Sequence, residues 1–207
     1  MLRVLVGVPI FEHEEVRYAE SVGLAIKSDL ATVGVVRVVG TNTPNARNIV
    51  VRKALDGNYD YVLFFDADMV YPSSTLDKLL AHDKDIVGGY YHAVRDSHLV
   101  QVFCKGDDGN YMDFIPKSRG LVKVDCVGGG CMLVRTKVFK SVSFPWFNYE
   151  LIGDVLSTED TTFSRKASAA GYKIYCDAGV RCGHVGKFVV WPDDEISRVR
   201  LESARTS

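Results

Sequence analysis

Two aspartates follow a strongly apolar segment, in the order Phe65-Asp66-Ala67-Asp68. On extended backbone, residues i and i+2 project to the same face, and the small Ala67 between the two acids leaves that face open. Two carboxylates this close repel each other, and a divalent cation relieves the repulsion. The segment therefore predicts a metal site; a solvated turn before Pro72 is the alternative.

A histidine stands at the end of the last expected strand. His184 follows Gly183 and precedes Val185-Gly186, so that small neighbours would let a ligand approach the backbone closely. An imidazole beside the carboxylate of Asp68 makes a mixed ligand set suited to Mn²⁺, with Mg²⁺ as the other candidate. A histidine that satisfies its hydrogen bonds in the core or at the surface is the alternative.

A third acidic group opens the last expected helix, in Thr158-Glu159-Asp160. Thr158 fits the N-cap, and acids in the first turn complement the helix dipole, which is an adequate structural explanation for Glu159. A carboxylate presented from a helix N-terminus can also serve as a general base, and Asp160 is the candidate. Both explanations stay open for this pair.

Strands and helices alternate along the chain and must position these residues. Near-continuous apolar runs predict strands covered on both faces. The expected strands of the first half are Arg3–Val8, Val33–Val39, Tyr61–Asp66 and Asp85–Gly89. The expected helices are Glu15–Lys27, Asn45–Leu55, a short one from Pro72 or Ser73 to Ala81, and one from Ser157 or Thr158 to about Ala170.

The second half changes pattern to short β segments separated by Gly and Asp. These segments are Leu99–Cys104, Tyr111–Ile115, Leu121–Cys126, Cys131–Val134, Lys173–Cys176 and Val180–His184, before a polar helix over 193–204. We therefore predict an α/β fold with a mainly parallel sheet flanked by helices and a small antiparallel patch in the second half. In such sheets ligands bind beyond the carboxyl ends of the strands.

Composition excludes several classes of protein. The chain has 207 residues, 47% hydrophobic and 25% charged, which is typical of one globular domain and argues against disorder. A net charge of −1 gives no basic field for nucleic acid or an anionic membrane. With no apolar run long enough to span a bilayer and no signal peptide pattern, a cytoplasmic protein is expected. The spacing of the 5 cysteines favours buried reduced thiols over a zinc site or disulfides.

Four segments together resemble glycosyltransferases of the GT-A fold, and most closely the family 2-like enzymes. VLVGVPIF resembles their first strand and nucleotide loop, and NARN followed by YVLFFDADMVYP resembles the segment leading into their DxD motif. GGGCMLVR resembles their acceptor-side glycine segment. STEDTTFSRKASAAGYKIY followed by GHVG resembles their base-bearing helix and late metal-ligand histidine. The resemblance covers about residues 3–188, in the family's order.

The resemblance implies a role for each matching residue. Asp68 would bind the metal directly, Asp66 would bind the ribose or reach the metal through water, and His184 would be a further ligand. Asp160 would be the catalytic base, with Glu159 beside it. The remaining positions would contact the nucleotide sugar, and these are Pro9, Ile10 and Phe11 at the nucleoside, Arg47 near the diphosphate, Ala67 within the DxD motif, and Gly129 and Gly130 beside the donor sugar and acceptor.

The implied activity is that of a hexosyltransferase-type enzyme. It would use Mn²⁺ or Mg²⁺ to transfer a sugar from a nucleoside diphosphate sugar, with UDP-sugar favoured over GDP-sugar, to a glycan or other hydroxyl acceptor. The expected domain spans 1–207, with a nucleotide-binding half of about 1–97, an acceptor and catalytic half of about 98–190 and a polar tail over 191–207. The alternatives are a metal-dependent hydrolase of a phosphorylated or nucleotide substrate and a non-catalytic module that binds sugar nucleotides. An NAD-type oxidoreductase is disfavoured because no GxGxxG follows the first strand.

Overall fold

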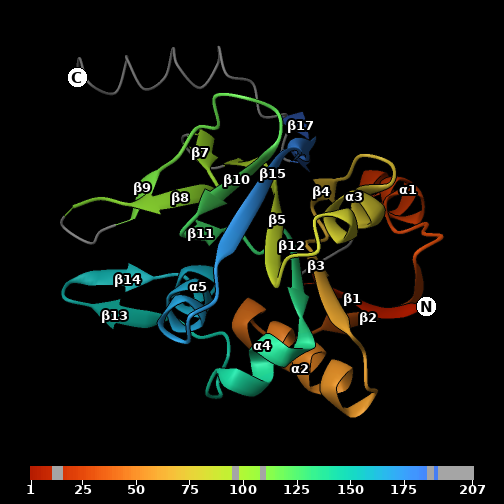
Figure 1. The fold of residues 1–207 in the computed structure, drawn as a ribbon, viewed down its shortest axis with the longest axis horizontal. Helices are drawn as coiled ribbons and strands as arrows, with labels where there is room; N and C mark the ends of the chain where they lie inside the picture. Colours follow the sequence, from red (N-terminus) through yellow and green to blue (C-terminus); the bar gives the residue numbers. More distant parts are fainter. Residues whose placement is uncertain (11–15, 95–97, 108–110, 186–188, 191–207) are drawn as a thin grey trace.

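The computed structural model describes residues 1–10, 16–94, 98–107, 111–185 and 189–190. Within these residues a central sheet of 7 strands runs in the order β10-β15-β5-β12-β3-β1-β2 (Figure 1). The strands are β1 (Leu2–Ile10), β2 (Ala31–Val39), β3 (Tyr61–Phe65), β5 (Ile86–Tyr90), β10 (Leu121–Val124), β12 (Cys131–Arg135) and β15 (Ile174–Arg181).

The central sheet is mixed. β1 is parallel to β2 and β3, and β5 is parallel to β15. β12 lies between β3 and β5 and is antiparallel to both, while β10 is antiparallel to β15. The predicted α/β class is confirmed, but the mainly parallel layout is not, because only half of the neighbouring pairs are parallel.

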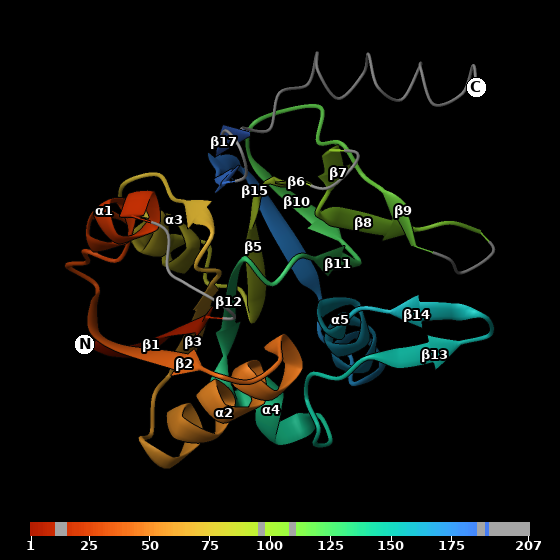
Figure 2. The same ribbon diagram turned by 180° about the vertical axis from the view of Figure 1, so that it is seen from behind.

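Helices cover both faces of this sheet, as Figures 1 and 2 show from opposite sides. The core on one face includes residues of α2 (Thr43–Asp56), α4 (Thr136–Ser141) and α5 (Glu159–Ala169). The core on the other face includes residues of α1 (Val16–Ala25) and α3 (Thr75–Ala81). β3 and β5 are buried along their whole length, which explains why their sequences are continuously apolar rather than alternating.

Capping by local side chains explains where some of the helices begin, but not all of them. At α2 the side chain of Asn42 accepts a hydrogen bond from the Asn45 amide, and Pro44 occupies the first turn, where a missing N–H costs nothing. Ser74 stands at the N-cap of α3, but its backbone is left-handed (φ 57°) and its side chain makes no capping bond. α4 was not expected from the sequence.

Short antiparallel pairs occupy the second half of the chain, and the predicted antiparallel patch is confirmed by the sheet β11-β8-β9. Its strands are β8 (Val102–Lys105), β9 (Tyr111–Asp113) and β11 (Cys126–Val127). The smaller sheets pair β6 (His92–Val94) with β7 (His98–Val100), β13 (Glu150–Ile152) with β14 (Val155–Ser157), and β16 (Gly183–Val185) with both β4 (Met69–Val70) and β17 (Val189–Val190).

Other expectations can be compared directly with the structure. All five cysteines are free, and the expected burial is confirmed for four of them, whereas Cys104 is partly exposed. Among the described residues, no helix is both long enough and apolar enough to span a bilayer. The expected helix over 193–204 lies outside the described residues.

Candidate functional site

The first part of the candidate site lies at one edge of the central sheet, where β3 and β5 end. Asp66 follows β3, and Tyr91 follows β5. Because β12 is antiparallel to both, its beginning reaches the same edge and brings Gly130 there. The Asp66 amide donates to the Gly130 carbonyl at 3.3 Å, and the Gly130 amide donates to the Tyr91 hydroxyl at 2.9 Å.

A second tyrosine fixes the backbone around Asp66. The hydroxyl of Tyr71 lies 2.7 Å from the Gly130 carbonyl oxygen and 3.0 Å from the Asp66 carbonyl oxygen. Its ring stacks on Phe65, with ring centroids 3.7 Å apart. Sequence reasoning missed Tyr71, and only its place shortly after the two aspartates could have pointed to it.

Arg47 of α2 joins this edge to α5. Only 2% of the residue is exposed, and its Nη2 donates to Asp66 Oδ1 at 2.8 Å. Its Nη1 donates to Glu159 Oε1 at 2.7 Å, and the rings of Phe64 and Phe147 each lie 5.9 Å from the guanidinium carbon. The guanidinium therefore holds two protein carboxylates, and the position near a diphosphate that the resemblance implies for Arg47 stays a prediction.

The glycine segment before β12 packs against this guanidinium. A Cβ at Gly129 would lie 1.8 Å from Arg47 Nη1, and a Cβ at Gly130 would lie 2.6 Å from Met69 Sδ. A side chain at either position would require the neighbouring side chains to shift, because its space is already filled by protein atoms. The predicted contact of Gly129 and Gly130 with donor sugar and acceptor stays a prediction.

Asp160 sits in the first turn of α5 and faces the glycine segment. Its Oδ2 accepts a hydrogen bond from the Gly129 amide at 3.1 Å. Its Oδ1 accepts from the Thr161 amide at 2.8 Å and from the Thr158 hydroxyl. The expected cap, Thr158, occupies the N-cap without a capping bond from its own side chain, and Asp160 binds a first-turn amide instead.

The two acids of this turn thus have different partners. Glu159 is ion-paired with Arg47, whereas Asp160 is held by amides and a hydroxyl. Burial raises the pKa of Glu159, although Arg47 opposes this effect. The two carboxylates therefore differ: that of Glu159 is bound to a cation, whereas that of Asp160 accepts hydrogen bonds from neutral donors.

Negative charge is in excess around Arg47. Burial alone would lower its pKa, but Asp66, Glu159 and Asp160 outweigh burial and raise it. Burial, with Asp66 and Asp160 nearby, also raises the pKa of Tyr91 well above its usual value. One guanidinium facing three carboxylates leaves a net negative field at this edge, which favours a cation.

Asp68 and His184 meet through a short strand pairing. β4 and β16 are antiparallel, with His184 opposite Met69, and the Val185 amide donates to the Asp68 carbonyl at 2.7 Å. His184 Nε2 lies 3.6 Å from Asp68 Oδ2, which exceeds hydrogen-bond length. The other ring nitrogen, Nδ1, is buried and has no hydrogen-bond partner among the described residues.

This pair fits a metal only as part of a ligand set. Among the described residues, no three His, Cys, Asp or Glu side chains gather closely enough to hold an ion by themselves. Mg²⁺ and similar ions commonly take one or two protein ligands and complete their shell with water and substrate phosphates. A carboxylate and an imidazole within 3.6 Å match such a partial set.

The predicted nucleoside contacts lie on β1 and at the DxD motif. Pro9 and Ile10 were expected in a loop after a strand ending at Val8, but both are buried residues of β1. Pro9 is tolerated because β1 pairs with β3 only as far as Gly7, so one side of the strand needs no donor there. Ala67 is also buried, and Phe11 lies outside the described residues.

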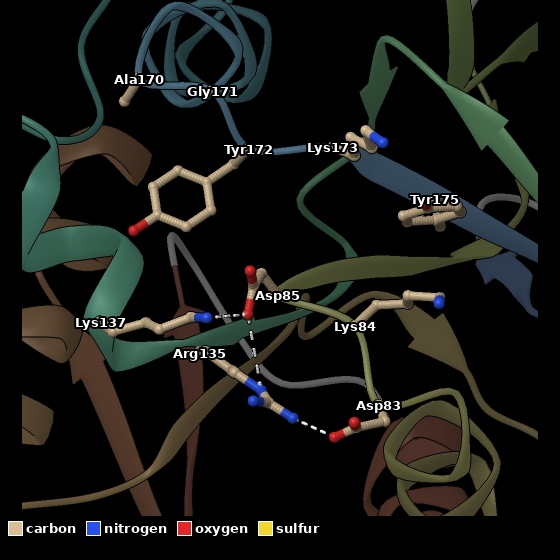
Figure 3. A pocket seen from close by; sticks show the side chains of 10 residues that line it. All are labelled: Asp83, Lys84, Asp85, Arg135, Lys137, Ala170, Gly171, Tyr172, Lys173 and Tyr175. Carbon is tan, nitrogen blue, oxygen red and sulfur yellow. Dashed lines mark hydrogen bonds and ion pairs between the residues drawn. The ribbon is translucent and has the colours of Figure 1, made fainter.

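A charged pocket of about 440 Å³ lies at the opposite edge of the sheet, where β5 and β15 begin (Figure 3). Its charges pair with each other. Arg135 contacts Asp83 and lies 3.7 Å from Asp85, which also accepts from Lys137 at 2.7 Å. This pocket is separate from the acids described above, and its four basic and two acidic lining residues give it a net positive charge.

Comparison with known proteins shows a similarity of fold. No family model matches the sequence, and no curated protein matches it. The crystal structure of A197 from STIV is similar to this chain, with a TM-score of 0.65 over 94% of this chain and 95% of that chain. At 17% sequence identity, this similarity shows a shared fold alone.

Proposed function

We propose that the protein is a metal-dependent glycosyltransferase of the GT-A fold that moves a sugar from a nucleoside diphosphate sugar to a hydroxyl acceptor. The proposal is supported by the position of Asp66, Glu159 and Asp160 around Arg47 and the glycine segment. Arg47 binds Asp66, two residues before Asp68, and Glu159, the neighbour of Asp160. Asp68 in turn faces His184.

The site chemistry suits this reaction. When bound, a divalent ion would neutralise the charge that develops on the leaving nucleoside diphosphate. Asp68 and His184 are the residues that would hold the ion, and Asp66, two residues before Asp68 in the sequence, is proposed for the ribose or a metal-bound water. An acceptor hydroxyl is a weak nucleophile, and a carboxylate that takes its proton contributes typically ~10²–10⁴-fold. Asp160 is the residue proposed for this step, because its carboxylate is not bound to a cation.

Ligand-dependent thermal stability tests the proposal. UDP-, GDP-, dTDP- and CDP-linked sugars are each added with Mn²⁺ and with EDTA. A ligand at 100 times its Kd stabilises by roughly 2.7 kcal/mol, which is a shift of several degrees for a domain of this size. We expect one nucleotide class, UDP first, to stabilise the protein only when metal is present.

Two variants sharpen the result. Asp68→Ala should abolish the metal-dependent shift and sugar transfer, while Asp107→Ala, an exposed carboxylate on the β8–β9 hairpin, should change neither. Binding of Mn²⁺ with no response to any nucleotide sugar would contradict the proposal and favour the metal-dependent hydrolase. Transfer that survives Asp68→Ala would contradict the assigned metal site.

A further inference from the structure

The hairpin β13–β14 exposes an unusual amount of apolar surface. Leu151 is 67% exposed, Ile152 44%, Val155 70% and Leu156 64%. In the hairpin register Leu151 is opposite Leu156, and Ile152 is opposite Val155, so the two pairs lie on opposite faces. Both faces of the hairpin are therefore apolar and exposed.

This hairpin, called the arm below (residues 150–157), projects from the body of the molecule beside α5 in both views (Figures 1 and 2). Among the described residues no third strand pairs with it, so the backbone groups of its outer edges are open. A two-stranded hairpin by itself is marginally stable in water. An arm of this kind is stabilised when another surface covers it.

A groove on the same molecule matches the arm in chemistry. It has a volume of about 650 Å³ and lies between α2 and the segment before β13, and six of its twelve lining residues are apolar or aromatic. Among them are Ile49, Phe144, Phe147 and Tyr149, and Phe144 and Tyr149 are 57% and 49% exposed.

The charges of the arm and of the groove are also of opposite sign. The turn of the arm is Gly153-Asp154, with an exposed carboxylate at its tip. The groove carries Arg52, whose guanidinium carbon lies 5.3 Å from the centre of the Phe144 ring. An acidic tip on an apolar arm thus corresponds to a basic residue beside an exposed aromatic ring in the groove. The same carboxylate disfavours insertion of the tip into a bilayer.

We propose that two copies of the chain associate by exchanging arms, with the arm of each copy lying in the groove of the other. Such an interface is self-complementary, as a two-fold dimer requires. The exposed side chains of the arm and the groove have a combined accessible surface on the order of 500 Å² per copy, which is at the upper end of what one apolar patch on a monomer exposes. Two copies together then bury about 1,000 Å² or more, the lower limit for a specific interface.

Light scattering coupled to size exclusion tests the dimer over a dilution series. The wild-type chain should have a mass of twice 22.9 kDa. Leu156→Glu should give a monomer, whereas Leu24→Glu should remain a dimer, because Leu24 is equally exposed (61%) but lies on α1. Since both leucines face solvent, each variant should keep the wild-type circular dichroism spectrum. A wild-type monomer at the highest concentration would overturn the proposal.

A charge exchange tests the arm-in-groove arrangement itself. Asp154→Arg places two cations together and should raise the dimer dissociation constant about tenfold or more. Adding Arg52→Asp in the same chain should restore the wild-type value. Failure of the second change to restore association would contradict this placement of the arm. Co-sedimentation with phosphatidylglycerol vesicles that Leu156→Glu abolishes, without a dimer, would show instead that the arm binds membranes.

Discussion

Nη1 of Arg47 lies 2.7 Å from Oε1 of Glu159, although 112 positions separate the two residues in the sequence. The same guanidinium holds Asp66 through Nη2. One side chain of α2 therefore ties the end of β3 to the start of α5. Two carboxylates of the candidate site, those of Asp66 and Glu159, are therefore held in place by a buried cation as well as by their own helix and strand.

Loss of that cation should destabilise the fold. Arg47→Met leaves Asp66 and Glu159 as partly buried carboxylates without their partner, and breaking a buried pair in this way costs about 3–5 kcal/mol. Lys53→Met removes an exposed cation from the same helix and should change the free energy of unfolding by less than about 1 kcal/mol. Urea unfolding measures both. Equal effects of the two substitutions would show that the buried ion pairs contribute little.

The two acids of α5 should respond differently to neutralisation. Asp160→Asn should leave nucleotide-sugar binding intact while the rate of transfer falls by ~10²–10⁴-fold, because the proposed base is lost. Glu159→Gln removes one partner of Arg47 and should chiefly lower the free energy of unfolding. Calorimetric binding, transfer assays and urea unfolding separate the two outcomes. Parallel loss of binding and transfer in Asp160→Asn would indicate a structural role for Asp160.

Gly129 and Gly23 offer a matched pair of glycine substitutions. A Cβ at Gly129 would lie 1.8 Å from Arg47 Nη1, whereas a Cβ at Gly23 in α1 would meet nothing within 4 Å. Gly129→Ala should therefore destabilise by about 1–3 kcal/mol through overpacking, or more if the Arg47 ion pairs break. Gly23→Ala should stabilise by about 0.5–1 kcal/mol because alanine favours the helix. A neutral result for Gly129→Ala in urea unfolding would mean that Arg47 can move aside.

Thiol chemistry should follow burial. Iodoacetamide at pH 8 should modify Cys104 in the native protein and the other four cysteines only after unfolding, which peptide mass spectrometry can read. Burial raises the pKa of Cys126, Cys176 and Cys182 above the ordinary 9.0. The native state therefore keeps these protons when the unfolded state loses them. Stability contributed by the neutral thiols is present below pH 9 and is lost as pH rises above it.

Most elements of the sheet could be predicted because their sequences carry a local pattern. The apolar run Tyr61–Phe65 is β3 as expected, and the first two helices differ from prediction by a few residues. Two separate strands were expected around Gly179, but β15 continues through it. A register shift follows Asp177, whose side chain binds the Gly179 amide, so the bulge keeps the strand intact.

The direction of β12 and the role of Arg47 could not be predicted in the same way. An apolar strand has the same pattern whether it runs parallel or antiparallel to its neighbours, so the mixed sheet became visible only in three dimensions. The partners of Arg47 are set by how α2, β3 and α5 pack. The arm was not predicted, although its sequence carries a local hairpin pattern. Gly153-Asp154 between two apolar pairs is typical of a hairpin turn.

Only Thr158 separates the last residue of β14 from Glu159, the first residue of α5. Any surface that binds the arm therefore also restrains the turn that carries Glu159 and Asp160. In a dimer formed through the arms, the neighbouring copy would therefore help to hold Glu159 and Asp160 of each site in place. The proposed transfer activity per molecule would then fall on dilution, and the concentration of the protein itself would regulate it.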